Sequence, residues 1–194
     1  MKTSTFSAIL CSCGLFISAQ VLALDAAAQD EAIGQARQLI QRYGGNLKKE
    51  LKQAIKSGGV AQAVETCHLK APDIASDLSD QSGWTVRRTS LKVRNLEDAP
   101  DRWETRVLEQ FEQRRKAGEP LDHMDYSETV TRNGKTLFRY MKAIPTGKIC
   151  LKCHGESVDS QVEKQLDSLY PFDQARGFHV GDIRGAFSVS KEVK

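Results

Sequence analysis

The chain contains few of the features that divide a protein into parts or direct it to nucleic acid. Only 5 of its 194 residues are proline, and no repeat, proline-rich linker or low-complexity block separates one region from another. Basic and acidic residues nearly balance, at 28 and 25, and the net charge of +3 is too small to indicate nucleic acid or an anionic membrane as a partner. With 40% hydrophobic residues, the composition predicts one soluble globular domain with its own core.

A long hydrophobic run occurs at the N-terminus, from Phe6 to Leu24, after a short basic start. Small residues follow at once, at Ala26–Ala28, and this order is typical of a secretory signal peptide. We therefore predict a signal peptide at residues 1–23 and a single mature domain at residues 24–194, located in the periplasm or otherwise exported. The alternative is an uncleaved membrane anchor, because the run approaches the length of a membrane span.

Cysteine is scarce, and two cysteines stand in a short motif. Cys150-Leu151-Lys152-Cys153-His154 has the form CxxCH, the attachment signature of c-type haem. Two thiols at this spacing can form thioethers with one porphyrin, and His154 is then placed to coordinate the iron. Bacteria attach this kind of haem outside the cytoplasm, which agrees with the predicted export. The motif therefore predicts a covalently bound haem c, attached through Cys150 and Cys153.

Cys67 would be a lone thiol in the mature protein if haem uses the other two cysteines, because Cys11 and Cys13 lie in the predicted signal peptide. An odd cysteine in an exported protein indicates an intermolecular disulfide, a reactive thiol or a metal ligand. Free cysteine also packs as a small hydrophobic residue. The count of cysteines leaves these alternatives open.

Two other chemistries are compatible with the motif. Cys150 and Cys153 could form a thioredoxin-like redox pair, but no βαβ pattern surrounds them and the following histidine would be unexplained. A zinc site built from Cys150, Cys153, His154 and Cys67 would have an acceptable set of ligands.

Hydrophobic spacing predicts helices in the first half of the chain and strands in the second. The first predicted helix is Glu31–Ser57, which Gly58-Gly59 ends and Gly44-Gly45 kinks. The second is about Val60–Lys70, which Ala71-Pro72 ends. The third is Asp98–Gly118, and the last contains Val162, Leu166 and Leu169. The predicted strands are Trp84–Thr89, Asp125–Thr131, Lys135–Ile144 and Gly185–Val189, with a hairpin at Asn133-Gly134. This order predicts an α+β fold with antiparallel strands.

Six blocks of sequence, spread from about Ala54 to the C-terminus, carry a resemblance to a known family. They are Ala63–Pro72, Arg87–Asn95, Ala99–Glu104, Cys150–Gly155, Tyr170–Asp173 and Gly181–Ala186. The chain resembles the Tll0287-like (DUF3365) c-type haem domain family. The resemblance implies a PAS-like fold, an antiparallel sheet flanked by N-terminal and crossing helices, that holds one covalently attached haem c. It also implies an unusual pair of axial iron ligands, His154 and the thiolate of Cys67.

Several other residues are weaker candidates for contact with the haem. His68, His123, Met124 and His179 are expected to be surface or packing residues, and Met141 to lie in the core. Haem propionates require cationic or hydrogen-bonding partners, and Arg87, Arg88 and Arg184 are candidates. The alternative is that these arginines are solvated or pair with Asp101, Glu104 or Asp182.

The sequence contains no recognisable acid-base pair beside an open coordination site, so we do not expect an enzyme. With both axial positions filled by the protein, we expect a redox or gas sensor, in which loss of the thiolate on reduction gives two states. The alternative is a periplasmic low-potential electron-transfer protein, because a thiolate stabilises ferric iron. Either function requires an unidentified redox or signalling protein as partner. Membrane contact is expected only if the signal peptide is uncleaved.

Overall fold

The computed structural model of the protein describes residues 16–132 and 134–193. Residues 1–15 of the predicted signal peptide, and the side chains of residues 16–25, lie outside the described residues, so the signal peptide stays a prediction. Among the residues that the structure describes, no helix is both long enough and hydrophobic enough to cross a membrane.

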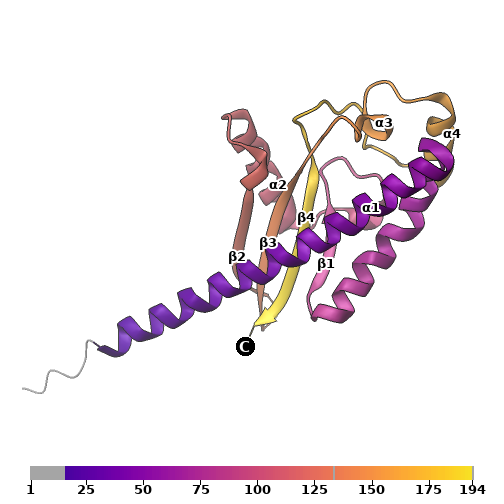
Figure 1. Ribbon diagram of the computed structural model, residues 1–194. Coiled ribbons are helices and arrows are strands. Elements are labelled where there is room, and N and C mark those ends of the chain that lie inside the picture. Colours follow the sequence, from indigo (N-terminus) through magenta and orange to yellow (C-terminus); the bar gives the residue numbers. More distant parts are fainter. Residues whose placement is uncertain (1–15, 133, 194) are drawn as a thin grey trace, which may run out of the picture.

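A four-stranded antiparallel sheet forms the centre of the fold, in the order β1-β4-β3-β2 (Figure 1). The strands are β1 (Thr85–Thr89), β2 (Asp125–Arg132), β3 (Lys135–Pro145) and β4 (Ile183–Val193). β2 and β3 form the predicted hairpin, and Gly134 in its turn has a φ of 74°, which glycine adopts without strain. The sheet and its helices confirm the predicted α+β class.

The longest helix, α1 (Phe16–Ser82), consists of two arms that meet at Gly59. Gly59 is the residue in this helix with non-helical dihedral angles, φ 78° and ψ −173°. The first arm crosses one face of the sheet, and the second arm returns beside β1 (Figure 1). The predicted break at Gly58-Gly59 is confirmed, because glycine lacks the Cβ that makes a positive φ costly.

Two other expectations about α1 are wrong. The helix does not end at Ala71-Pro72 but continues to Ser82, because Ala71 and Leu78 bury hydrophobic surface and offset the hydrogen bond that Pro72 cannot donate. The helix is also not kinked at Gly44, where its backbone is helical. Instead Gly44 lets the helix approach the sheet, since a Cβ at this position would lie 3.1 Å from Cζ of Phe187.

The second helix, α2 (Arg102–Lys116), packs on the other face of the sheet. Asp101 caps its N-terminus and forms a reciprocal capping box with Glu104. The predicted helix is confirmed, but it begins at Arg102 rather than at Asp98, which ends a separate 3₁₀ turn. The remaining helices are the single turn α3 (Leu151–His154), α4 (Ser160–Leu169) and the 3₁₀ turns η1 (Leu96–Asp98) and η2 (Leu121–His123).

Hydrophobic side chains form three clusters. The first arm of α1 packs on one face of the sheet and α2 on the other, where it covers Met124 and Met141. In the third cluster, Val64 of the second arm packs against Val162 and Leu166 of α4. This third cluster holds the segment around α3 against the second arm of α1, the arm that carries Cys67.

Candidate functional site

The CxxCH motif occupies the short helix that follows β3. The amide of His154 donates to the carbonyl of Cys150 over 2.9 Å, so Cys150, Cys153 and His154 share one helical turn. The loop before this turn is held at the start of β4, where the amide of Thr146 donates to the carbonyl of Asp182 over 2.8 Å. Both cysteines of the motif are half-buried free thiols. The motif is therefore a fixed turn anchored at the edge of the sheet.

The imidazole of His154 is oriented by the backbone of a distant loop. Its Nδ1 lies 2.7 Å from the carbonyl oxygen of Ala175. Because that oxygen can only accept, Nδ1 carries the proton and Nε2 carries the lone pair. Burial and the nearby Arg184 and Arg94 hold the pKa of His154 well below its usual range. The ring is therefore neutral, as a metal ligand must be, and has the backbone partner typical of ligating histidines.

Cys67 approaches the same region from the second arm of α1. Its thiol is half-buried and free, and burial raises its pKa while Arg88 and Arg94 act in the opposite direction. Burial also raises the pKa of Cys153, which is close enough for the charge of Cys67 to contribute to the rise. Cys67 and Cys153 are more than eighty positions apart in sequence, so the tertiary structure brings them together.

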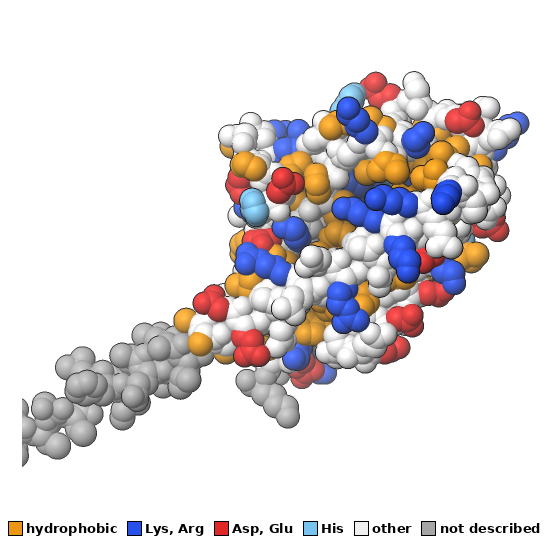
Figure 2. Space-filling model, viewed as in Figure 1, with side chains coloured by type: hydrophobic (Ala, Val, Ile, Leu, Met, Phe, Trp, Pro, Cys, Tyr) orange, Lys and Arg blue, Asp and Glu red, His pale blue; other side chains and the backbone are white. Residues whose placement is uncertain are grey.

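These residues fit the haem that the motif predicts. Two thiols share one turn with an imidazole whose Nε2 is unprotonated and could bind a metal in place of its contact with Arg184, and a third thiol comes from a separate helix. Figure 2 shows hydrophobic and basic side chains gathered on the face between α1 and the segment that carries α3. A hydrophobic macrocycle with two carboxylates would meet matching side chains there. Among the described residues, by contrast, no three His, Cys, Asp or Glu side chains converge as the zinc alternative would require.

A buried ion pair stabilises the region around the motif. Arg94 lies 3.1 Å from the carboxylate of Asp173, and their side chains are 13% and 2% exposed. The guanidinium of Arg94 also donates to the carbonyls of Cys153 and Ala175, over 2.5 and 3.2 Å. Arg94 therefore links α3 to the loop that orients His154. The sequence patterns did not predict a role for these two residues, although both stand in blocks that carry the family resemblance.

Arg184 and Arg88, two of the candidate propionate partners, lie at this site. Nε of Arg184 is 3.3 Å from Nε2 of His154, which can accept a hydrogen bond from it. Burial and the charges of Arg94 and Arg88 lower the pKa of Arg184 to about 9. Arg88 is close enough to Cys67 to lower the pKa of its thiol.

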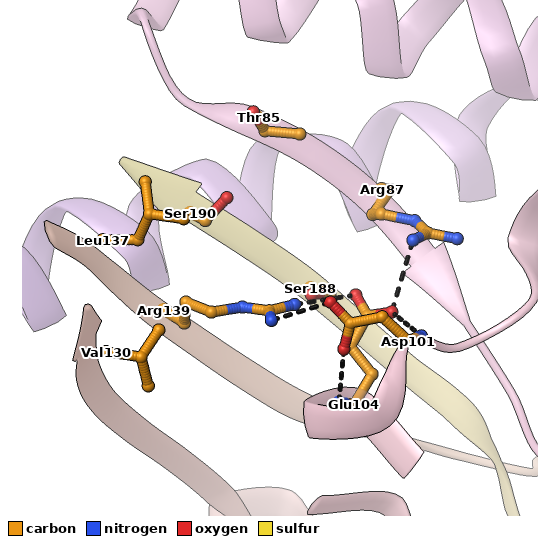
Figure 3. A pocket seen from close by; sticks show the side chains of 9 residues that line it. All are labelled: Thr85, Arg87, Asp101, Glu104, Val130, Leu137, Arg139, Ser188 and Ser190. Atoms are coloured by element: carbon orange, nitrogen blue, oxygen red, sulfur yellow. Dashed lines mark hydrogen bonds and ion pairs between the residues drawn. The ribbon is translucent and has the colours of Figure 1, made fainter. Parts of the chain in front are cut away.

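Arg87, the third candidate, lies elsewhere. Its guanidinium is 3.2 Å from Glu104, on the face of the sheet that α2 covers. Arg139 reaches the same group from β3 and lies 2.8 Å from Asp101 (Figure 3). These side chains line one side of a cavity of about 220 Å³ over β1, β4 and β3, which Val130 and Leu137 also line. Arg87 therefore pairs with Glu104, the alternative that the sequence left open, and not with a haem propionate.

The other candidate iron ligands have separate environments. Met124 and Met141 are fully buried in the core under α2, as expected for Met141. His179 lies at the surface, 3.3 Å from Glu156, and His123 is exposed. His68 packs its ring edge-on against Tyr170, with centroids 5.0 Å apart.

Comparison with known proteins gives one family and one solved structure. The family model described as Tll0287-like matches residues 24–191. The crystal structure of the cyanobacterial heme-protein Tll0287 has the same fold, with a TM-score of 0.62 and 24% sequence identity. The match covers 84% of this chain and 96% of that one. No curated protein matches the chain.

Proposed function

The chain belongs to the Tll0287-like family, and we propose that it is an exported cytochrome that binds one haem c covalently. In this proposal Cys150 and Cys153 form the thioethers, and His154 and Cys67 are the axial ligands of the iron. The solved relative is itself a cyanobacterial heme-protein, which agrees with the proposal. When bound, the haem supplies an iron that exchanges one electron between its ferric and ferrous states.

The hydrogen bond between Nδ1 of His154 and the carbonyl of Ala175, 2.7 Å long, is the observation that carries the proposal. It fixes the proton on Nδ1 and leaves the lone pair of the imidazole on Nε2. Two half-buried thiols, Cys150 and Cys153, stand on the same turn as this ring. A histidine that served only the core would not require two free thiols on its own turn. The carbonyl is held in place in turn, because Arg94 donates to it.

Cys67 is the proposed second ligand because it belongs to a different element from His154. Val64, one turn before Cys67 on α1, packs against α4, and Cys153 packs against the same cluster. The second arm of α1 and the motif therefore share one hydrophobic cluster. Hydrophobic surroundings between Cys67 and His154 would suit a planar hydrophobic group such as haem. Burial disfavours a free thiolate at Cys67, so a bound ferric iron would stabilise its charged form.

We propose a redox or gas sensor as the role of this site. A thiolate binds ferrous iron more weakly than ferric iron, so Cys67 would be the ligand lost on reduction, while Val64 would keep the second arm of α1 packed against α4. Such a ligand change gives a two-state element that a partner protein can read. The proposed role is not catalytic, because both axial positions are filled by the protein.

An electron-transfer protein of low potential is the second candidate, and the exposed hydrophobic side chains favour it. Ile149, Phe172 and Val180 are 42%, 66% and 57% exposed, and all three stand in segments next to α3. Exposed hydrophobic surface beside a redox group suits brief docking of a partner protein. The partner would be another exported redox protein.

Optical spectra of the protein matured in a host with c-type haem machinery test the proposal. We expect haem that survives acid-acetone extraction and ferric bands typical of low-spin thiolate ligation. Replacement C67A should abolish the thiolate bands and raise the reduction potential, because the thiolate stabilises ferric iron. His68→Ala is the matched control, since His68 is the next residue and should leave the thiolate bands unchanged.

Two outcomes would contradict the proposal. The absence of covalent haem would refute haem c binding, and an unchanged ferric spectrum in C67A would refute Cys67 as ligand. Carbon monoxide then separates the two roles. Rapid binding by the reduced protein supports the sensor, and retention of both ligands through the redox cycle supports the electron carrier.

A further inference from the structure

Three arginines, Arg88, Arg94 and Arg184, act on the charge of His154 in the CxxCH turn, and among the described residues two of them form no ion pair with a carboxylate. Asp173 neutralises Arg94, at 3.1 Å, and is shared with Arg176, at 3.0 Å. In the described parts of the chain, residues 16–132 and 134–193, neither Arg88 nor Arg184 forms an ion pair with a carboxylate.

Each of these two guanidinium groups is incompletely satisfied. Nε of Arg88 is buried and has no hydrogen-bond partner among the described residues. Among the described residues, the partners of Arg184 are neutral: the ring of His154, the hydroxyl of Ser90 and the carbonyl of Lys92, at 3.2 to 3.3 Å. Both side chains are half-buried, and a half-buried charge without a paired counter-charge is costly. The carboxylates that act on Arg184 are Asp173, which Arg94 already uses, and Asp98, whose charge is shared with Arg88 and Arg87. The excess of positive charge therefore indicates an anionic ligand.

We infer that Arg88 and Arg184 bind the two propionate carboxylates of the haem, an inference that rests on the proposed function. Haem carries two carboxylates, and two guanidinium groups at the site, those of Arg88 and Arg184, have no ion pair with a carboxylate of the described residues. Guanidinium and carboxylate form charge-assisted pairs that are often bidentate, so arginine suits this role better than lysine. Nε of Arg184 lies 3.3 Å from Nε2 of His154, the atom that would bind the iron, so this guanidinium would leave the nitrogen for a propionate when haem is bound. Arg88 acts on the charge of the other proposed ligand, Cys67.

Arg87 provides a matched control within the same strand. It is the residue before Arg88 in β1, and alternation along the strand directs it to the opposite face of the sheet. There it is paired with Glu104 at 3.2 Å and donates to the carbonyls of Glu97 and Ala99. Arg87→Gln therefore removes the same charge from the same strand without touching the proposed propionate site.

The experiment compares the matured haem proteins of wild type, Arg88→Gln, Arg184→Gln and Arg87→Gln. Resonance Raman spectra report the propionate-bending band, and redox titration gives the potential. We expect the band to shift in Arg88→Gln and Arg184→Gln. We also expect the ferrous-to-ferric ratio at a fixed applied potential to fall about tenfold in each, which corresponds to about 59 mV for one electron. A nearby positive charge favours the ferrous state, so its removal lowers the potential.

A second variant at Arg184 separates loss of charge from loss of the fold. Arg184→Lys keeps the charge and should recover most of the wild-type potential, although the propionate band should still differ because lysine cannot bind in a bidentate manner. It also keeps the test valid if Arg184→Gln fails to mature.

The outcomes distinguish this inference from the proposed function. Covalent haem with the same propionate band in wild type, Arg88→Gln and Arg184→Lys would overturn the inference and leave haem c binding intact. An equal effect of Arg87→Gln would also overturn it, because the effect would then be a general one of surface charge. Wild-type protein without covalent haem would overturn both.

Discussion

Arginines lie on both faces of the sheet, but among the described residues only those on the α2 face have their charge neutralised by ion pairs with carboxylates. On the face covered by α2, Arg87 and Arg139 meet Asp101 and Glu104 in a network that also caps the helix. On the face toward the CxxCH turn, Arg88 and Arg184 have no ion pair in the described residues. The neighbours Arg87 and Arg88 belong to different groups because strand residues alternate between faces. Arginines that are paired with carboxylates stabilise the fold, whereas arginines without such partners indicate a site for an anionic ligand.

The largest effect on stability is expected at Glu104. Its carboxylate is fully buried between Arg87 and Arg139, at 3.2 and 3.5 Å, and accepts from the amide of Asp101 over 2.9 Å. Glu104→Gln should lower the free energy of unfolding by about 3 kcal/mol, because it leaves two half-buried cations with one charged partner fewer. Urea denaturation measures the change, and Glu109→Gln, an exposed position on the same helix, is the control. A loss no larger than that of the control would refute the structural role of this network.

A smaller effect is expected at the ion pair that supports the CxxCH turn. Arg94→Gln breaks the pair with Asp173 and should cost about 2 kcal/mol of unfolding free energy, because Asp173 keeps Arg176 as a second partner. It should also loosen α3, since Arg94 donates to the carbonyl of Cys153. Faster alkylation of Cys153 by iodoacetamide in the haem-free protein would report this. Arg176→Gln, which contacts Asp173 but not α3, should leave the alkylation rate unchanged, and equal rates in both variants would contradict the assignment.

The smallest effect concerns acid stability on the α2 face. Burial alone would raise the pKa of Asp101, but hydrogen bonds from the Glu104 amide and the Arg139 guanidinium lower it overall. A carboxyl group whose folded pKa lies below its unfolded value stabilises the fold above the unfolded value, about 3.9, and loses this contribution as the pH falls through the folded pKa. In Asp101→Asn the loss of unfolding free energy below about pH 4 should therefore be shallower than in wild type. Urea denaturation at several acid pH values measures it, with Asp80→Asn as an exposed control. Parallel curves for wild type and Asp101→Asn would contradict the prediction.

Local sequence signals predicted most of the elements. The segment Asp98–Asp101 marked the start of α2 to within a few residues, and Asn133-Gly134 marked the hairpin of β2 and β3, because both signals act over a few residues. The error at Pro72 has the opposite cause. A proline normally ends a helix, but burial of Ala71 and Leu78 against distant residues outweighs the lost hydrogen bond. The PAS-like description of the fold, the signal peptide and the exported location stay predictions.

For the candidate site, the sequence by itself determined the chemistry of the motif. Cys150, Cys153 and His154 are close in sequence, so their spacing alone predicts one turn with two thiols and an imidazole. Only the tertiary structure decided what surrounds that turn. Ala175 orients His154, Arg94 pairs with Asp173, and Arg87 pairs with Glu104 on the face of the sheet opposite to Arg88. These contacts join segments far apart in the chain, and such pairings depend on how helices and strands pack, which short-range patterns do not encode.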